Sequence, residues 1–342
     1  MPPDEPSWWY RDDASVPAAA LAPVAALYGW VARSRFTLVK PYRSRLPVLC
    51  AGNFTAGGTG KTPLALHLCE VLRELGKRPV VLTRGYGGRT SGPHWVQAGD
   101  TADAVGDEAL LLRKAAPVLV ARDRAAGARS LEASPEADAI IMDDGLQNPQ
   151  LAKDLTIAVV DGRRGLGNGR IIPAGPLRAP LAFQLALADA IVVNGTSPGS
   201  AHQVADWLRQ HFKGPVLRST TTPRGDVSWL ARRRIIAWAG IGAPERFFSM
   251  VAALGAEIVE RIAFRDHQRL ALADAQRLLA LARQHNAVLV STEKDLARLE
   301  GAQDALAELS AATRPLQVRL VFSAQDTERL AGLVDAALKR SA

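Results

Sequence analysis

A short glycine-rich segment carries the residue types that bind an anion. Residues 53–63 read NFTAGGTGKTP, in which glycines precede Lys61 and Thr62. Glycine adopts backbone angles that other residues resist, so consecutive N–H groups can form a nest around an anion. Lys61 adds a positive charge, and the Thr62 hydroxyl is suited to binding Mg²⁺. The pattern predicts a phosphate-binding loop. Its residues are Thr55, Ala56, Gly57, Gly58, Thr59, Gly60, Lys61 and Thr62.

The segments on either side provide the strand and the helix that such a loop requires. Residues 46–51 (LPVLCA) are an apolar run typical of a buried strand, and leucine and valine recur at helical spacing over 64–75. A helix N-terminus directs its partial positive charge at a bound phosphate. The usual pattern G-x-x-x-x-G-K-[ST] has glycine where this chain has Thr55, so a glycine-rich turn is the alternative. Because GKT stands between a strand and a helix, we favour the phosphate loop.

A second segment ends an expected strand in two carboxylates. Residues 137–148 read ADAIIMDDGLQN, with Asp143 and Asp144 after the apolar run. In nucleotide-binding α/β folds, an acid at this edge of the sheet can hold the Mg²⁺ that bridges the phosphates. Adjacent residues of an extended chain point in different directions, so we expect one acid to face the metal directly, Asp144 in preference to Asp143. The alternative is a simple turn, since DDG is common in turns.

Four further segments place charged side chains at the ends of expected elements. Asp107 begins a helical pattern in VGDEALLL, where the alternative role is a helix cap. Arg84 follows a strand in TRGYGG, and Arg178 lies in the proline-rich PAGPLRAP. His267 lies in AFRDHQRL beside an aspartate. A single histidine is more often structural than catalytic, so these segments alone do not define a site.

Composition places the chain among ordinary globular proteins. Its 342 residues are 48% hydrophobic and 22% charged, which allows two domains and argues against disorder. The net charge of +8 fits phosphorylated substrates, anionic lipid or nucleic acid. Because the sequence has no zinc-finger or aromatic RNA-binding motif and no dense Lys/Arg tract, we expect no nucleic-acid partner. Cys50 and Cys69 have no metal-binding spacing, which fits a reducing cytosol.

The N-terminal region, 1–45, has the features of a helix at a membrane surface. Its acidic, polar beginning is unlike a secretory signal. Apolar residues near helical spacing follow, but prolines and arginines interrupt them, so we do not expect a membrane span. Tryptophan and tyrosine rings and a basic end suit a helix lying in the interface. A helix packed against its own domain is an equally open alternative.

Short apolar runs alternate with helical patterns along the rest of the chain. This alternation predicts an α/β fold with a mainly parallel sheet and helices on both faces, of the P-loop NTPase-like type. Residues 46–220 are expected to form the core domain. Threonines, prolines and arginines break the rhythm at 221–234, which we interpret as a linker. A second, smaller α/β domain is expected at 235–342.

Together these motifs resemble the tetraacyldisaccharide 4′-kinase family, the lipid A kinases of Gram-negative bacteria. The chain has NFTAGGTGKTP, TRGYGG, VGDEALLL, DDGLQN, IIPAGPLR and FRDHQRL in the order and approximate spacing of that family. The resemblance implies a kinase at the cytoplasmic face of the bacterial inner membrane, peripheral or monotopic. It implies transfer of the γ-phosphate of ATP, with Mg²⁺, to the 4′-hydroxyl of an acylated glucosamine disaccharide 1-phosphate.

The resemblance also implies roles for individual residues. Asp107 matches the family's catalytic base, and His267 matches the histidine that is its partner. The positions that match the phosphate- and metal-binding residues are Lys61, Thr62, Asp143 and Asp144. Arg84 and Arg178 are candidates for binding the substrate's 1-phosphate, since guanidinium groups bind phosphate well. Ala179 stands where many members have glutamate, so no role of that glutamate is carried over.

Two other classes of protein remain as alternatives. The first is a membrane-associated P-loop ATPase switch of the partitioning or targeting type, which also has GGxGKT. Those proteins often have a further lysine where this chain has Ala56. The second is a cytosolic kinase of a small metabolite, against which the basic, aromatic N-terminal region argues. ATP turnover that requires a lipid acceptor distinguishes the lipid kinase from the switch.

Overall fold

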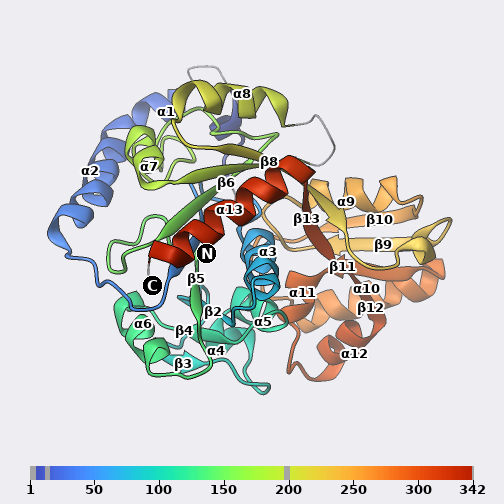
Figure 1. Cartoon of the computed structure of the whole chain (residues 1–342). Coiled ribbons are helices and arrows are strands. Elements are labelled where there is room, and N and C mark those ends of the chain that lie inside the picture. The colour runs from blue at the N-terminus through green and yellow to red at the C-terminus, as the bar shows by residue number, and fades with distance from the viewer. Residues whose placement is uncertain (1–4, 12–15, 196–200, 341–342) are drawn as a thin grey trace.

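Two mainly parallel sheets organise the chain, each with its own covering helices (Figure 1). The computed structural model describes residues 5–11, 16–195 and 201–340. The strands of the larger sheet are β1 (Val48–Asn53), β2 (Pro79–Thr83), β3 (His94–Trp95), β4 (Val118–Val120), β5 (Ala139–Asp143), β6 (Leu155–Asp161), β7 (Ala190–Gly195), β8 (Val216–Pro223) and β13 (Val318–Phe322). Within the described ranges these strands have the order β13-β8-β7-β6-β1-β5-β2-β4-β3.

The central strands are continuous apolar runs because both faces of the sheet are buried. β1 pairs in parallel with β5 on one side and with β6 on the other. Along β1, Val48 and Cys50 join one hydrophobic cluster, while Leu49 and Ala51 join another. Successive side chains of a strand point to opposite faces, so all four are buried. The edge strands β3 and β13 run antiparallel to their neighbours.

Helices cover both faces of the larger sheet, which confirms the predicted fold class. The helices on one face are α3 (Lys61–Glu74), α5 (Asp107–Arg113) and α13 (Ala324–Arg340). Those on the other are α6 (Arg124–Glu132), α7 (Leu181–Leu187) and α8 (His202–His211). Short helices complete this unit: η1 (Ser7–Tyr10), α1 (Val16–Ala20) and α4 (Ala102–Val105). Leu230 of η2 (Ser228–Leu230) instead packs in a hydrophobic cluster of the smaller sheet. This layering brings the carboxyl ends of β1 and β5 to one edge of the sheet.

The smaller unit also consists of a sheet with helices on both faces. Its strands are β9 (Arg234–Ala239), β10 (Glu257–Ala263), β11 (Val288–Thr292) and β12 (Thr313–Leu316), in the order β10-β9-β11-β12. Phe247 and Phe248 of α9 (Pro244–Ala253) pack on one face. The other face packs against α10 (Leu272–His285) and α12 (Asp304–Ala312). The short helix α11 (Glu293–Ala297) follows β11 directly.

The C-terminal end of the chain differs from the sequence-based expectation. The strand at 318–322 and the last helix were expected in the smaller domain, but β13 pairs with β8 and α13 packs on the larger sheet. The expectation is wrong here because the pairing of Leu320 with Thr221 joins distant parts of the chain, which no local pattern records. The expected linker at 221–234 also overlaps the end of β8. We propose instead a larger unit of residues 46–220 together with 318–340, and a smaller unit of residues 235–316.

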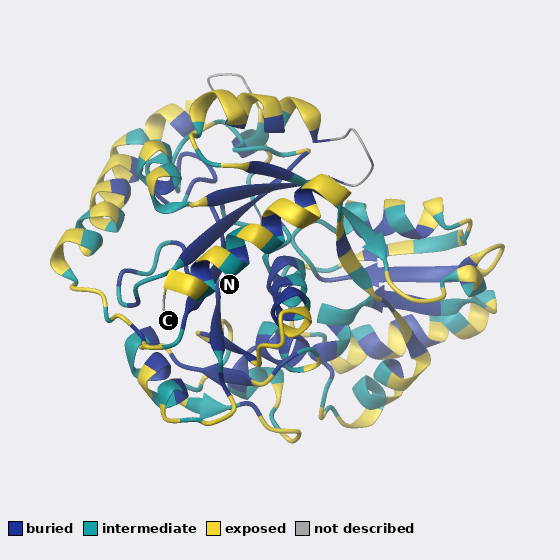
Figure 2. Ribbon diagram, viewed as in Figure 1, coloured by how far each residue is buried: buried dark blue, intermediate teal, exposed yellow. Residues whose placement is uncertain are grey.

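The helix α2 (Ala22–Leu38) lies along one edge of the molecule and is exposed over much of its length (Figures 1 and 2). Its exposed residues include large apolar ones. Leu27 is 62% exposed and Trp30 is 66% exposed. Its opposite side meets the rest of the larger unit, where Gly29 is buried close to the side chain of Ile171. The helix is therefore anchored on one side and presents an apolar strip on the other.

Part of the expected N-terminal region, at 1–4 and 12–15, lies outside the described residues. Over the described part of the chain, no helix has both the length and the apolar character needed to cross a membrane.

Candidate active site

The glycine-rich segment forms the turn between β1 and α3. Gly57 and Gly60 have φ angles of +89° and +102°, in the left-handed region that glycine adopts without strain. The helix begins at Lys61, directly after Gly60. The Asn53 side chain donates a hydrogen bond to the backbone carbonyl of Thr55 at 2.7 Å, which braces the loop from within. The loop therefore lies at a helix N-terminus, where phosphates bind.

The remaining loop residues differ in burial, and the Asn53 side chain contacts one of them. Thr55, Thr59 and Thr62 are buried, whereas Ala56 is half-buried and Gly58 is exposed. Thr59 accepts a second hydrogen bond from the Asn53 amide at 3.0 Å. Gly58 lies opposite Gly242 of the smaller unit, so the loop faces the junction of the two units.

Asp143 ends β5, the strand beside β1 in the sheet. Its Oδ2 accepts a hydrogen bond from the Thr83 hydroxyl at 3.3 Å. Its Oδ1 is buried and has no hydrogen-bond partner among the described residues. Burial raises the pKa of Asp143 to about 7, and the nearby charges of Glu108 and Asp144 act in the same direction. An uncompensated buried carboxylate is costly, so this position fits a cation.

Asp144 has a different environment from its neighbour. Its φ angle of +49° is in the left-handed region and turns the chain away from the strand direction. Its Oδ1 lies 2.6 Å from Nη1 of Arg178 and 3.7 Å from Nζ of Lys61. Burial acts to raise the pKa of Asp144, but the charges of Arg178 and Lys61 outweigh it and hold the pKa well below its usual range. Arg178 also donates to the carbonyl of Thr55 at 3.1 Å, so the structure places it on the loop.

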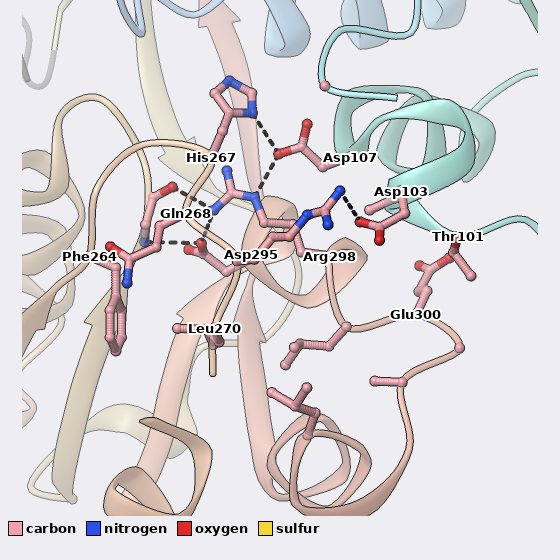
Figure 3. A pocket seen from close by; sticks show the side chains of 18 of the residues that line it. Thr101, Asp103, Asp107, Phe264, His267, Gln268, Leu270, Asp295, Arg298 and Glu300 are labelled. Atoms are coloured by element: carbon pink, nitrogen blue, oxygen red, sulfur yellow. Dashed lines mark hydrogen bonds and ion pairs between the residues drawn. The ribbon is translucent and has the colours of Figure 1, made fainter. Parts of the chain in front are cut away.

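Asp107 and His267 meet across the two units (Figure 3). Nδ1 of His267 lies 3.0 Å from Oδ2 of Asp107. Asp107 is the first residue of α5 and is buried, while His267 follows β10 in the smaller unit. His267 has a φ angle of +58°, a conformation that is uncommon outside glycine and frequent at functional sites. The two residues that the family resemblance pairs are thus in direct contact.

Two cations that were not predicted from the sequence complete this cluster. Nε of Arg298 lies 2.7 Å from Oδ2 of Asp107, and Nζ of Lys294 lies 3.2 Å from Nε2 of His267. Burial acts to raise the pKa of Asp107, but the hydrogen bond from His267 and the charges of Lys294 and Arg298 hold it well below its usual range. Their position in the sequence was the one available indication: Lys294 and Arg298 come soon after the apolar run AVLVS, just as Asp143 stands at the end of an apolar strand in the larger sheet.

A cavity of about 300 Å³ opens beside the cluster (Figure 3). Asp107 and His267 line it at one end. Tyr86 contributes from the larger unit, and Trp238 and Phe264 contribute apolar surface from the smaller unit. The carboxylate of Asp107 therefore borders a space that both units enclose.

Comparison with known proteins identifies the family. A family model described as tetraacyldisaccharide-1-P 4′-kinase matches residues 17–339. A tetraacyldisaccharide 4′-kinase of Methylorubrum extorquens is 48% identical over 341 residues, which cover 98% of this chain and 99% of that protein. The protein of the same name from Nitrobacter winogradskyi is 46% identical and covers 93% of both chains. The chain belongs to the tetraacyldisaccharide-1-P 4′-kinase family.

A solved structure supports the fold of this family member. The crystal structure of LpxK from Aquifex aeolicus, an "apo" form in complex with ATP, superposes with a TM-score of 0.74 at 24% identity. The match covers 94% of this chain and 100% of the Aquifex chain. Because so much of the chain is covered, the likeness extends over both α/β units.

Arg84, the second arginine that the sequence predicted at the site, lies apart from the loop contacts of Arg178. It is exposed, and its Cζ lies 5.2 Å from the ring centroid of Tyr86. The Tyr86 ring in turn meets the His267 ring edge-on, with 5.2 Å between centroids. Arg84 is near enough to contribute to the lowered pKa of Asp144, after Arg178 and Lys61. It therefore lies at the rim of the site, on the side of His267.

An N-terminal residue of this family member also reaches the glycine-rich loop, which was not predicted. Glu5 occupies the space that a side chain at Gly57 would need. Its Oε2 accepts hydrogen bonds from the Tyr10 hydroxyl at 2.9 Å and from Nη1 of Arg164 at 2.8 Å. Burial raises the pKa of Glu5, against the opposing charge of Arg164. A periodic sequence pattern could not predict this contact, because Glu5 and Gly57 are distant in the sequence and meet only in the folded chain.

Proposed function

We propose that the protein transfers the γ-phosphate of ATP to the 4′-hydroxyl of a tetraacylated glucosamine disaccharide 1-phosphate. Membership of the kinase family over residues 17–339 supports this activity. The observation that carries the proposal is the contact between Asp107 and His267, because transfer to an alcohol needs a positioned group that accepts the hydroxyl proton. A phosphate loop without such a pair would bind a nucleotide but lack this proton acceptor.

The nucleotide binds at the loop between β1 and α3. Backbone N–H groups at the start of α3 and the ammonium of Lys61 neutralise the ATP phosphates. Arg178 is held between Asp144 and the Thr55 carbonyl, which favours a role at the nucleotide rather than at a distant 1-phosphate. Arg84, at the rim, remains the candidate for the 1-phosphate of the acceptor.

The residues at this edge of the sheet fit a magnesium ion. Thr62, Asp143 and Asp144 offer hydroxyl and carboxylate oxygens, which are the ligands that Mg²⁺ prefers. The buried oxygen of Asp143 that has no hydrogen-bond partner within the described residues supports this assignment. When bound, the ion would neutralise charge on the transferred phosphate.

Asp107 accepts the proton of the sugar hydroxyl, and His267 orients it. Because the pKa of Asp107 is held low, the carboxylate is ionised at neutral pH and acts through its position more than through strong basicity. Since His267 belongs to the smaller unit, the site is complete only when the two units are docked. Docking also excludes water, which limits unproductive hydrolysis of ATP.

The acyl chains require an apolar surface, for which α2 is the candidate. We assign α2 to the membrane interface, with Leu27 and Trp30 entering the lipid. Basic residues follow at Lys40, Arg43 and Arg45. This arrangement supports a peripheral or monotopic protein at the cytoplasmic face of the inner membrane.

A transfer assay tests the proposed function. Purified protein is incubated with γ-labelled ATP, Mg²⁺ and a tetraacylated disaccharide 1-phosphate in mixed micelles. We expect label on the glycolipid at the 4′ position. Label on a water-soluble acceptor alone, or ATP hydrolysis that a protein partner stimulates and the lipid does not, would instead support a small-molecule kinase or an ATPase switch.

A further inference from the structure

The segment after β11 brings two cations to the candidate catalytic pair. Residues 291–299 read STEKDLARL, and α11 starts inside this segment. Lys294 and Arg298 both belong to it, and both contact residues of α5 in the larger unit (Figure 3 shows Arg298). The segment lies directly beside α5, so one short stretch of chain contacts Asp107, Glu108 and His267 together.

Arg298 is held rigidly on the smaller unit. Its Nη1 donates to the carbonyl of Gly240 at 2.6 Å and to Oδ1 of Asp295 at 2.7 Å. Asp295 is buried and also accepts hydrogen bonds from the Gly240 N–H and the Thr292 hydroxyl. Nε of the same guanidinium is thereby aimed at Oδ2 of Asp107. A guanidinium presents its donors in a fixed planar fork, so this geometry positions the carboxylate.

Lys294 contacts the second ring nitrogen of His267, Nε2. Its Nζ lies 3.2 Å from Nε2 of His267 and 3.3 Å from Oε1 of Glu108. An ammonium group donates hydrogen bonds and cannot accept them, so Nε2 must be the accepting nitrogen. The ring proton is then on Nδ1, which faces Oδ2 of Asp107. This is the tautomer in which His267 donates to the carboxylate.

We propose that Lys294 and Arg298 are positioning residues for phosphoryl transfer: Arg298 orients the Asp107 carboxylate, and Lys294 keeps His267 in the tautomer that donates to that carboxylate. The proposal rests on the proposed function for its kinetic consequences, although the tautomer is a property of the protein alone. Oδ2 of Asp107 accepts hydrogen bonds from Nδ1 of His267 and Nε of Arg298. Oδ1 accepts one hydrogen bond, from the N–H of Glu108 at 2.9 Å. Oδ1 is therefore the atom with a lone pair left for the hydroxyl proton.

The first experiment measures the pH profile of transfer. The charged groups around Asp107 are His267, Lys294 and Arg298 from the smaller unit and Glu108 on its own helix. Asp266 belongs to the same cluster, with its Oδ1 3.7 Å from Lys294 and from Arg298 and 3.8 Å from Nε2 of His267. Burial raises the pKa of Asp107, and the neighbouring cations lower it. Removing one cation therefore raises the pKa of Asp107. The ionised form is the active one, and the acid limb of kcat/KM therefore moves to higher pH in Arg298→Met. We expect kcat at neutral pH to fall about 100-fold, as for other misplaced catalytic groups, with KM for ATP within about threefold of the wild type.

Two further variants make this experiment decisive. Arg298→Lys keeps a positive charge and is expected to restore the position of the acid limb in part. Lys114→Ala is the matched control, because Lys114 pairs with Glu300 across the same junction at 2.9 Å without touching Asp107. We expect its profile to match the wild type. The proposal is overturned if folded Arg298→Met and Arg298→Lys give the wild-type profile, or if Lys114→Ala shifts the acid limb equally.

The second experiment reads the tautomer directly and does not require activity. Histidine labelled with ¹⁵N is incorporated, and the His267 resonances are assigned with His267→Gln. We expect Nε2 of His267 to be unprotonated at pH 7 in the wild type and in Lys294→Arg, but not in Lys294→Met. An unchanged Nδ1–H tautomer in Lys294→Met overturns the role of Lys294, whether or not the transfer assay succeeds. Absence of transfer in the wild type overturns the proposed function instead.

Discussion

At the scale of single residues, three aspartates differ because of what surrounds them. Burial, with nearby acids, raises the pKa of Asp143 to about 7. Although burial opposes it, cations hold the pKa values of Asp144 and Asp107 well below the usual range. The sequence predicted all three positions from their places at element ends. It did not predict their ionisation, because partners such as Arg178 and Arg298 come from distant segments.

Replacing Asp143 tests whether its carboxylate is a site for a cation. In the protein without Mg²⁺ and nucleotide, Asp143→Asn removes a buried group that is costly to ionise. We expect the free energy of unfolding at pH 8 to rise by about 1–3 kcal/mol. We expect kcat for transfer to fall at least about 100-fold, because the metal would lose a ligand. Chemical denaturation and the transfer assay measure the two effects, and a variant that is less stable yet fully active would contradict this assignment.

At the scale of elements, chemistry lies where strands end and helices begin. The loop follows β1, the acid pair lies at the end of β5, and His267 follows β10. The strands were predictable because they contain buried apolar runs, such as 79–82 in β2 and 139–142 in β5. β8 was not, since its VLRSTTTP sequence is largely polar and half-buried. The helix α11 is too short to show a helical period, which is why its cations escaped prediction.

The glycine that precedes α3 is expected to be necessary for nucleotide binding. A Cβ at Gly60 would lie 2.8 Å from Nδ2 of Asn194, and the φ angle of +102° is unfavourable for other residues. The left-handed conformation costs about 1–2 kcal/mol for alanine, so Gly60→Ala is expected to weaken ATP binding about tenfold or more. Calorimetric titration with ATP measures this. Gly76→Ala is the control, because Gly76 also has a positive φ but a Cβ added there would have no atom within 4 Å. Equal affinities for the two variants would contradict the role of Gly60.

The exposed strip of α2 is expected to bind lipid. Leu27→Ser combined with Trp30→Ser removes two large apolar side chains, each of which contributes about 1.5–3 kcal/mol when buried. We expect flotation with anionic vesicles to fall more than about tenfold while the melting temperature stays unchanged. Leu272→Ser is the control, since Leu272 is 48% exposed on α10 of the smaller unit. If the double variant floats as well as the wild type, the membrane contact lies elsewhere.

At the scale of the whole molecule, the site is shared between two units. The larger unit contributes the loop, the acid pair and Asp107, and the smaller unit contributes His267 and Arg298. The sequence predicted two α/β units because the alternation of strands and helices is interrupted near 221–234. It did not predict that β13 returns to the larger sheet, since that pairing depends on tertiary structure. The return of the chain ties the smaller unit to the larger one at both of its ends.

The measurement that tests this account most directly separates nucleotide binding from transfer in Asp107→Asn. The side chain keeps its shape but loses the charge that accepts the proton. We predict that ATP affinity, measured by calorimetry, stays within about threefold of the wild type, while kcat for transfer to the tetraacylated disaccharide falls by at least about 100-fold. The surface variant Asp206→Asn, on α8, is expected to behave as the wild type. Near-normal transfer by Asp107→Asn would contradict the assignment of Asp107 as the proton acceptor.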